Sequence, residues 1–255
     1  MKKLLSLTIA ILVVGALQAQ TNTITTTTSS TPQKWRIGLT ANLGGSWLKS
    51  NKAEMQYKTP GLQYGLNLQV EKRLTNSISF LTGLGVSWHS GTVSFVNDTN
   101  TVVNIIASNS QFELLSRTYS FQSVDVPLGL KLKTNEIGMI TYFAQVGLLP
   151  SLRINASATN NTVKVGNTET ILDGANKKMI VNDANFLRAS IFGGVGIEYS
   201  LSGSTALTAS IQYVSGFMST LHSTSDHLYT NGNSNNKLAQ NLMSNYITLN
   251  AGILF

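Results

Sequence analysis

The sequence contains no cysteine and no apolar stretch of 18 or more residues. The missing cysteines exclude both a disulfide framework and a lipid anchor attached to a cysteine. The missing long apolar stretches exclude helical membrane spans, which need about 20 such residues. A chain of 255 residues without these features must be held together by the hydrogen bonds and packing of its own fold.

The N-terminal segment has the features of an export signal. Two lysines precede an apolar run of 14 residues, Leu4–Leu17, and small residues stand near its end at Ala16 and Ala19. The run is too short to cross a bilayer, so a cleaved signal peptide over residues 1–19 is favoured over an uncleaved anchor. Residues 20–33 are rich in Thr and Ser and are predicted to be a disordered leader.

The remaining residues, 34–255, alternate between apolar and polar side chains. Successive side chains of a strand point to opposite faces, so this period of two predicts strands with one apolar face. The eight predicted strands cover residues 34–48, 62–71, 78–89, 119–133, 140–154, 187–199, 207–217 and 246–255.

Two of these segments contain an irregularity. Tyr119 and Phe121 fall on the opposite parity to Val124 and the apolar residues after it, which predicts a β-bulge before Val124. Pro150 has no N–H to donate to a ladder, so its strand is predicted to be bulged or frayed at that point.

Strand and connection lengths together indicate a membrane barrel. The segments are about 10 to 16 residues long, whereas most strands of water-soluble domains have about 5–6. Connections at 74–76, 134–138 and 201–204 are short, and those near 49–60, 90–117, 157–185 and 218–244 are long and polar. Short periplasmic turns and long external loops are typical of outer-membrane barrels, and an even number of strands leaves both termini periplasmic.

The physics of the bilayer requires such a sheet to close. An unpaired backbone group in hydrocarbon costs several kcal/mol, and closure removes the sheet edges. The predicted fold is therefore all-β: an eight-stranded antiparallel up-and-down transmembrane β-barrel, integral to the bacterial outer membrane. At eight strands the lumen is just wide enough to be filled by side chains.

Aromatic side chains near the strand ends lie on the apolar face. Such rings favour the two membrane interfaces, and we expect them to form girdles there. They are Trp35, Trp47, Trp88, Tyr142, Tyr199, Phe217 and Phe255.

Three runs and the last strand resemble a known family. They are VDVPLGLKLK (Val124–Lys133), FAQVGLLPSLRINA (Phe143–Ala156), FGGVGIEYSLSGSTALTASIQY (Phe192–Tyr213) and NYITLNAGILF (Asn245–Phe255). Over roughly residues 34–255 the chain resembles the Bacteroidetes-type outer-membrane β-barrel domain family, often called PorT-like, which includes small barrels of the OmpA type. The resemblance implies assembly by the barrel-assembly machinery, which reads a terminal strand such as the one ending at Phe255. It implies no particular activity, although one branch is associated with protein secretion.

The polar faces carry charged side chains that are predicted to line the lumen. Folding the first hairpin about its loop centre places Arg36 close to Glu71. Because buried charges must be paired, we interpret the set first as a structural network that fills the lumen. The alternative is a polar pathway or small-anion site with Arg153 and Arg188 near the outer mouth. The set comprises Arg36, Glu71, Arg73, Asp125, Lys131, Arg153, Arg188 and Glu198.

The net charge of +7 does not indicate nucleic-acid binding. The four long connections hold eight cations and seven anions, whereas the strands and turns hold eight cations and four anions. The positive excess therefore lies in the barrel, not in a surface stripe that could follow phosphates, and no nucleic-acid partner is expected.

Motifs for catalysis and metal binding are weak. Ser87 and His89 could suggest a lipid hydrolase, but both are predicted to face inward, and no carboxylate is placed to orient the imidazole. His222, Asp226 and His227 resemble metal ligands only loosely, in a loop rich in Asn and Ser. No phosphate-binding glycine loop or nucleophile elbow is present. We therefore predict no catalytic residue, no metal and no cofactor.

Four functions remain open at this point. The first is a non-enzymatic barrel with a structural, adhesive or secretion-accessory role through its external loops, with outer-membrane lipid and envelope or secretion proteins as partners. The second is a small porin or transporter, and the third is an outer-membrane lipid hydrolase. The fourth is a periplasmic lipocalin-like barrel, which would have an apolar inner face and a polar outer face.

Overall fold

The computed structural model describes residues 34–96, 103–107, 110–165, 168–171, 177–231 and 233–255. The predicted signal peptide and leader lie outside the described residues. Within them, every regular element is a strand except the 3-10 helix η1 (Val181–Asp183). No helix in this part of the chain is long and apolar enough to cross a membrane.

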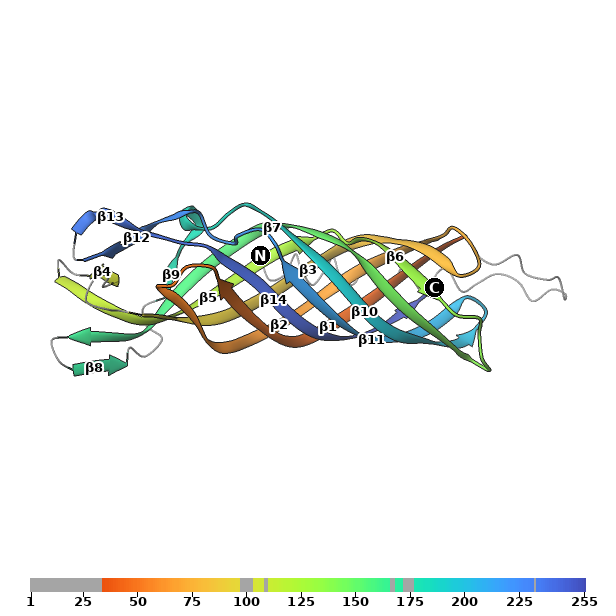
Figure 1. Ribbon diagram of the computed structural model, residues 1–255. Coiled ribbons are helices and arrows are strands. Elements are labelled where there is room, and N and C mark those ends of the chain that lie inside the picture. The colour runs from red at the N-terminus through yellow and green to blue at the C-terminus, as the bar shows by residue number, and fades with distance from the viewer. Residues whose placement is uncertain (1–33, 97–102, 108–109, 166–167, 172–176, 232) are drawn as a thin grey trace, which may run out of the picture. The chain divides into compact units, whose positions relative to one another are not determined.

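Eight long strands form a closed antiparallel ring (Figure 1). Seven are single elements: β1 (Trp35–Ser50), β2 (Met55–Arg73), β3 (Ile78–Phe95), β7 (Ile140–Val165), β10 (Leu187–Ser202), β11 (Thr205–Gly216) and β14 (Leu242–Leu254). The eighth consists of β5 (Ser110–Asp125) and β6 (Leu128–Lys133), which both pair with β3 on one side and β7 on the other. β14 pairs with β1, so no edge is left open, and the predicted fold class is confirmed.

The pairings determine how the strands are staggered around the ring. Following paired residues from Gly45 of β1 through β14, β11, β10, β7, β6, β3 and β2 leads back to Trp35, ten residues along β1. A ring with this stagger has strands tilted by about 35–45° to its axis, and its lumen is narrow enough for side chains to fill.

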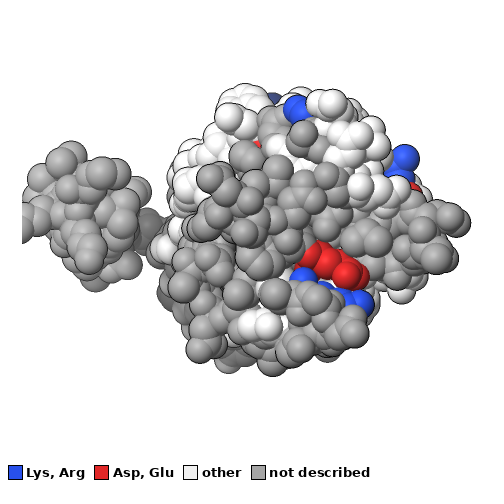
Figure 2. Space-filling view, turned by 90° about the vertical axis from the view of Figure 1, so that its left-hand side faces the viewer, with Lys and Arg blue, Asp and Glu red and all other residues white. Residues whose placement is uncertain are grey.

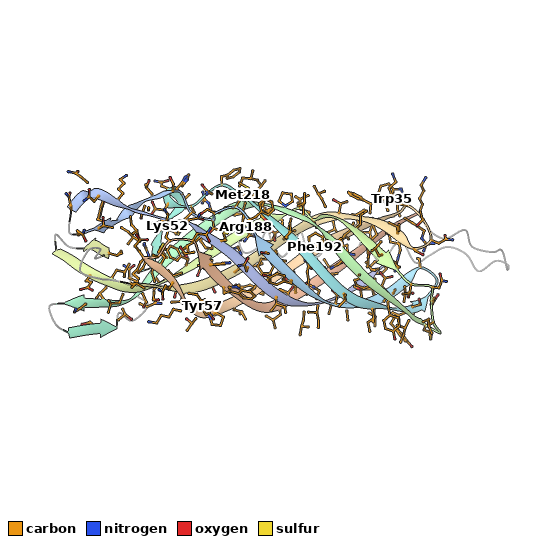
Figure 3. All side chains as sticks on the ribbon, in the orientation of Figure 1. Trp35, Lys52, Tyr57, Arg188, Phe192 and Met218 are labelled. Carbon is orange, nitrogen blue, oxygen red and sulfur yellow. The ribbon has the colours of Figure 1, made fainter. Side chains whose placement is uncertain are left out.

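The two ends of the barrel differ. Residues 74–77, 134–139 and 203–204 turn at the end where β1 begins and β14 stops, which we name the short-turn end. Gly203 in the two-residue turn adopts a φ of +60°, a left-handed conformation that favours glycine. Trp35 lies near this end, whereas Lys52 and Tyr57 lie toward the other (Figure 3).

The opposite end, which we name the hairpin end, carries the remaining short strands (Figure 1). They are β4 (Val103–Ala107), β8 (Thr168–Ile171), β9 (Lys177–Met179), β12 (Thr224–Thr230) and β13 (Asn233–Ala239). The long connections predicted here therefore contain extended structure. The one predicted at 49–60 is only residues 51–54, because β1 and β2 continue further than their membrane-type pattern does.

Around the middle of the barrel the apolar face points outward. Leu43, Val195 and Leu249 are 58%, 62% and 65% exposed, while the polar residues Thr40 and Gln63 are buried inside. This arrangement contradicts the lipocalin-like alternative, which requires the reverse polarity.

At the hairpin end the polarity is inverted along the same strands. Tyr119 and Phe121 of β5 are buried inside the ring, together with Val93 and Phe95 of β3. The pairing of β3 with β5 runs without a break from Gly85–Asp125 to Ser94–Ser116, so the bulge predicted before Val124 is wrong. The parity of the apolar residues changes because the inner face passes from a polar lumen to an apolar core. A register shift does occur opposite Gln122–Ser123, but it lies in the pairing with β7.

The prediction for Pro150 is wrong in a related way. β7 runs through Pro150, which pairs with Ala189 of β10. The N–H of Val126 donates to the Pro150 carbonyl at 2.9 Å, but Pro150 has no N–H to return the bond. The strand that is interrupted is therefore the one opposite, between β5 and β6.

Candidate functional site

Five charged side chains meet inside the short-turn end of the lumen. Lys131 lies 2.5 Å from a carboxylate oxygen of Glu71 and 2.5 Å from one of Glu198. Lys133 bridges the same two carboxylates at 2.7 and 2.9 Å. Arg36 lies 2.7 Å from Glu198 and 3.8 Å from Glu71. We name these five residues the short-turn cluster.

The cluster is nearly sealed from water. The side chains of Lys131 and Glu71 are 1% and 2% exposed, and the Lys131 ammonium lies 4.0 Å from the centre of the Phe143 ring. A Cβ at Gly196 would overlap this ring, so glycine there makes room for the aromatic cover. Three cations and two carboxylates at this depth form a network in which each cation lies against both carboxylates, with one positive charge in excess.

Four members of the cluster are among the residues that the sequence assigned to the inner face, and the fifth is not. Arg36 is the direct cross-strand partner of Glu71, as folding the first hairpin predicts. Lys133 was missed, although it shares the parity of Lys131 two residues earlier. Arg73 was expected in the network; it is partly exposed at the end of β2 and has no ion pair among the described residues.

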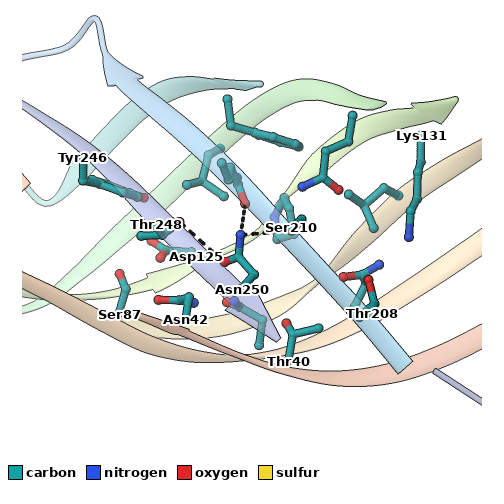
Figure 4. A pocket seen from close by; sticks show the side chains of 18 of the residues that line it. Thr40, Asn42, Ser87, Asp125, Lys131, Thr208, Ser210, Tyr246, Thr248 and Asn250 are labelled. Atoms are coloured by element: carbon teal, nitrogen blue, oxygen red, sulfur yellow. Dashed lines mark hydrogen bonds between the residues drawn. The ribbon is translucent and has the colours of Figure 1, made fainter. Parts of the chain in front are cut away.

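Beyond the cluster the lumen holds a cavity of about 70 Å³ lined by hydroxyl and amide groups (Figure 4). Along its wall, Asn250 of β14 donates to Ser210 at 3.2 Å and to Gln212 at 3.4 Å on the neighbouring β11. A single buried water needs about 10–15 Å³ of such cavity space, so the cavity has room for a few waters. Its polar lining residues include Thr40, Asn42, Asn67, Gln145, Thr208 and Thr248.

A second group of side chains closes the lumen toward the hairpin end. Arg188 donates to His89 Nε2 at 2.8 Å and to Ser151 at 3.2 Å, and it lies 3.8 Å from Asp125. The His89 ring stacks on Phe121, with a centroid distance of 5.4 Å, and lies 6.1 Å from Tyr246. We name these six residues the hairpin-side plug.

The plug bears on the hydrolase hypothesis. Because a guanidinium can only donate, His89 Nε2 is the acceptor of the Arg188 bond, and the ring proton sits on Nδ1. Neither that Nδ1 nor the Ser87 hydroxyl has a hydrogen-bond partner among the described residues. Asp125, the nearby carboxylate, pairs with Arg188. The geometry therefore offers no activated serine facing the lipid.

Arg153 and Arg188 were both predicted to face the lumen near its outer mouth, and the structure separates the two. Arg188 is buried in the plug, whereas Arg153 is partly exposed, with its Nε donating to the Asn185 carbonyl at 3.1 Å. Its strand shifts register at this position, which turns the side chain toward the connection that precedes β10.

The loosely spaced metal candidates of the sequence are not assembled into a site. His222 is exposed and donates its backbone N–H to the Asp183 carbonyl at 2.8 Å. The side chains of Asp226 and His227 lie outside the described set. Within that set no group of three potential ligands approaches metal-binding geometry.

The hairpin end encloses an apolar core of its own, separate from the lumen. Its fully buried members include Leu48, Leu114, Leu228 and Leu242, which come from β1, β5, β12 and β14. Arg117, assigned from the sequence to a loop, is a strand residue that is 1% exposed, with its guanidinium 5.4 Å from the centre of the Tyr119 ring. This end is therefore a compact β-structure rather than a set of polar loops.

The surface of the hairpin end carries charges of both signs. Figure 2 looks onto this end, where acidic and basic atoms adjoin among the coloured residues. Lys164 and Glu113 form an ion pair of 3.8 Å there, and both side chains are partly exposed. A mixed surface of this kind offers hydrogen bonds and charge to a partner without a single-sign field.

The aromatic side chains expected at the interfaces occupy two levels on the outer face. Trp35, Tyr142, Tyr199 and Phe255 lie toward the short-turn end, where Tyr199 pairs with Ile140 and Trp35 with Lys72. Trp47, Trp88 and Phe217 lie toward the hairpin end. There Trp47 stacks on Tyr213 at 6.1 Å and Trp88 on Tyr64 at 5.2 Å.

Comparisons with known proteins bear on the whole barrel. Residues 18–222 match a family model described as "Outer membrane protein beta-barrel domain". No curated protein matches the chain.

Solved structures with a similar trace are small barrels of low identity. Neisserial surface protein A is 10% identical, with 87% of this chain and 96% of that chain covered and a TM-score of 0.40. Ail, the attachment invasion locus protein of Yersinia pestis, is 13% identical over 88% and 100% of the two chains, with a TM-score of 0.34. The N-terminal β-barrel domain of Pseudomonas aeruginosa OprF is 11% identical over 86% and 97%, with a TM-score of 0.32.

Proposed function

Because the chain belongs to the outer membrane protein β-barrel domain family, we propose that it is a non-enzymatic membrane barrel that acts through its hairpin end. The role would be structural, adhesive or secretion-accessory, with envelope or secretion proteins as partners. Outer-membrane lipid would surround the middle of the barrel, and the barrel-assembly machinery would read the strand that ends at Phe255.

The orientation we propose follows from the difference between the two ends. Outer-membrane barrels have short turns on the periplasmic side and longer connections outside. The short-turn end, with both Trp35 and Phe255, would accordingly be periplasmic, and the hairpin end would be external. This places the compact apolar core of the hairpin end outside the membrane.

The observation that carries the proposal is the closed lumen. The short-turn cluster and the hairpin-side plug leave between them a cavity of about 70 Å³. An ion can cross a barrel only along a continuous water path, and two layers of interlocked side chains interrupt it. This favours a surface function over a porin, whose conduction would need both layers to open.

The hairpin end supports the same conclusion from the other side. Paired strands and buried leucines give the described part of this end a defined surface before any partner binds. Pre-organised surfaces bind with a smaller loss of conformational entropy than flexible loops do. A protein that acts by contact gains from such a platform, whereas a channel has no need of it.

Conductance measurements test the proposal. The full-length protein refolded into a planar bilayer should give no stable conductance step, while heat-modifiable gel migration confirms that it is folded. A reproducible large step, with an ion selectivity that changes in an Arg188→Ala variant, would establish the porin alternative instead.

A further inference from the structure

On one side of the barrel, apolar side chains remain exposed farther toward the hairpin end than the aromatic residues Trp47, Trp88 and Phe217. They belong to the last residue of β9 and the segment that leads from it to β10: Met179 is 58% exposed, Val181 40% and Phe186 63%. Ile154 of the neighbouring β7 is 52% exposed. We name the segment of residues 179–187 the apolar lip.

On β5 and β3 the outward residues in the same row are polar, although Tyr57 of β2 and Val96 after β3 are 50% and 41% exposed farther toward the hairpin end. Met179 pairs with Ser157, which pairs with Ser120, which in turn pairs with Ser90. The stagger of the ring makes such a row descend toward the short-turn end as it passes from β7 to β5 and β3. Ser90 thus lies nearer the middle of the barrel than Met179, yet it is the polar one. The distance of a residue from the middle of the barrel therefore does not by itself explain why the side chains of the lip are apolar.

The lip is held rigidly, so its exposed side chains are not free to fold back. Its backbone bonds to the segment after β11: Asn185 N–H donates to Thr220 at 3.0 Å, and Asp183 accepts from His222 at 2.8 Å. The Asn185 side chain donates to the carbonyls of Ser219 and Leu221 at 2.8 and 2.9 Å.

The inner face of the lip is already occupied. Ile180 and Ala184 are each 1% exposed and belong to the apolar core of the hairpin end. Val181 and Phe186 therefore have no interior position to occupy. Their apolar surface faces outward because Ile180 and Ala184 already fill the inner face.

The lip is continuous with the outward apolar face of the barrel. Leu187 at its end pairs with Leu152, and both are exposed, as is Ile191 four residues further along the same face of β10. Met218 forms its rim on the β11 side (Figure 3). This surface continues the apolar belt that contacts lipid. The simplest molecule to cover it is therefore also lipid.

Arg153 adds the polar component that such a surface needs. Its Nε is fixed on the Asn185 carbonyl of the lip, and no carboxylate among the described residues lies within ion-pair distance. A guanidinium beside apolar side chains at an interface can bind the phosphate of a lipid headgroup while its stem stays in contact with the acyl region.

We propose that the apolar lip inserts into the outer leaflet of the membrane, with Phe186 in the acyl region and Arg153 at the headgroup phosphates. The membrane would then reach higher on the β7–β10 side than on the β2–β3 side. This inference rests on the proposed membrane location and orientation, and it adds a lipid-binding surface to the hairpin end.

The natural absence of cysteine allows a direct test with single labels. Phe186→Cys carries an environment-sensitive fluorophore in the full-length protein, refolded into phosphatidylcholine vesicles that contain nitroxide-labelled lipid. Ser120→Cys is the matched control, because Ser120 lies on the outer face of β5 two residues above Gln122, the partner of Trp88. Leu249→Cys reports on the middle of the barrel.

The expected result is lipid-borne quenching at position 186 at least about twofold stronger than at position 120. Equal quenching at the two positions, or quenching at 186 only by a water-soluble agent, would overturn the inference. Protection at 186 that appears only at high protein-to-lipid ratio would indicate a second copy of the chain and would also overturn it. Absence of lipid quenching at 249 would refute the membrane location itself, so the two failures are distinguishable.

Discussion

Three cationic side chains share two carboxylates in the short-turn cluster, so its charges are not equivalent. Removing Glu71 leaves three cations and one anion in a space nearly sealed from water. Removing Lys133 leaves two of each sign. The cost of an uncompensated buried charge exceeds that of a lost but balanced ion pair.

A pair of substitutions tests this asymmetry. Glu71→Gln is expected to lower the free energy of unfolding by about 3 kcal/mol, because three buried cations are then left with one carboxylate. Lys133→Met should lower it by about 1 kcal/mol or less, since the remaining charges balance. Urea unfolding of each variant in lipid vesicles, followed by tryptophan fluorescence, measures both values. Equal losses would show that charge balance does not govern this cluster.

Single residues also mark where sequence reasoning succeeded and failed. Arg36 and Glu71 could be paired from the sequence, because a hairpin folded about its centre fixes the register over a short distance. The neighbours of His89 could not be found in this way. Arg188 reaches it from β10, a strand distant in the chain, and only the closed ring brings the two together; Asp125 joins the group through its ion pair with Arg188.

At the scale of the strand, one element serves two surroundings. β5 places Asp125 and Ser123 toward the polar lumen, and then Phe121 and Tyr119 toward an apolar core, all on the same face. The backbone alternation never changes; what changes is the solvent on each side. Once the strand leaves the lipid, water covers the outer face and the inner face becomes the place to bury apolar groups.

The core of the hairpin end should therefore respond to mutation separately from the barrel. Leu228→Ala leaves a cavity beneath β12 and should lower the free energy of local unfolding of the hairpin end by about 3 kcal/mol. This corresponds to a roughly 100-fold larger fraction of locally open molecules. Trypsin cleavage at the exposed Lys237 of β13 is the measurement. The heat-modifiable migration of the barrel should be unchanged.

Leu249→Ala is the matched control for that experiment. It removes the same atoms from an outward side chain that is 65% exposed on β14. Lipid fills the space, so cleavage at Lys237 should proceed at the wild-type rate. Accelerated cleavage in both variants would mean that the hairpin end and the barrel unfold as one unit.

At the scale of the whole molecule, the proposed orientation assigns each end of the barrel to one side of the outer membrane. Lys52 lies in the connection between β1 and β2 at the hairpin end, and Glu136 lies in the turn between β6 and β7 at the short-turn end; both are exposed. The orientation proposed here places the first outside the cell and the second in the periplasm.

Single cysteines at these two sites test the orientation in intact cells. A membrane-impermeant maleimide should label Lys52→Cys, because its site is external, and should leave Glu136→Cys unlabelled until the outer membrane is permeabilised. The opposite pattern would mean that the barrel is inserted the other way round, with the hairpin end and its apolar core in the periplasm. Labelling of both in intact cells would be incompatible with a barrel that spans the membrane.

The sequence by itself determined the number of membrane strands, their two faces and the first hairpin register, because alternation and turn spacing are local properties of a chain. It also identified most of the inward charges, since parity along one strand needs no knowledge of its neighbours. Only the tertiary structure decided which charges meet, where the apolar interior replaces the polar lumen, and that an apolar lip rises on one side. These depend on the stagger of the closed ring, which brings together residues from strands far apart in the sequence and sets where each leaves the membrane.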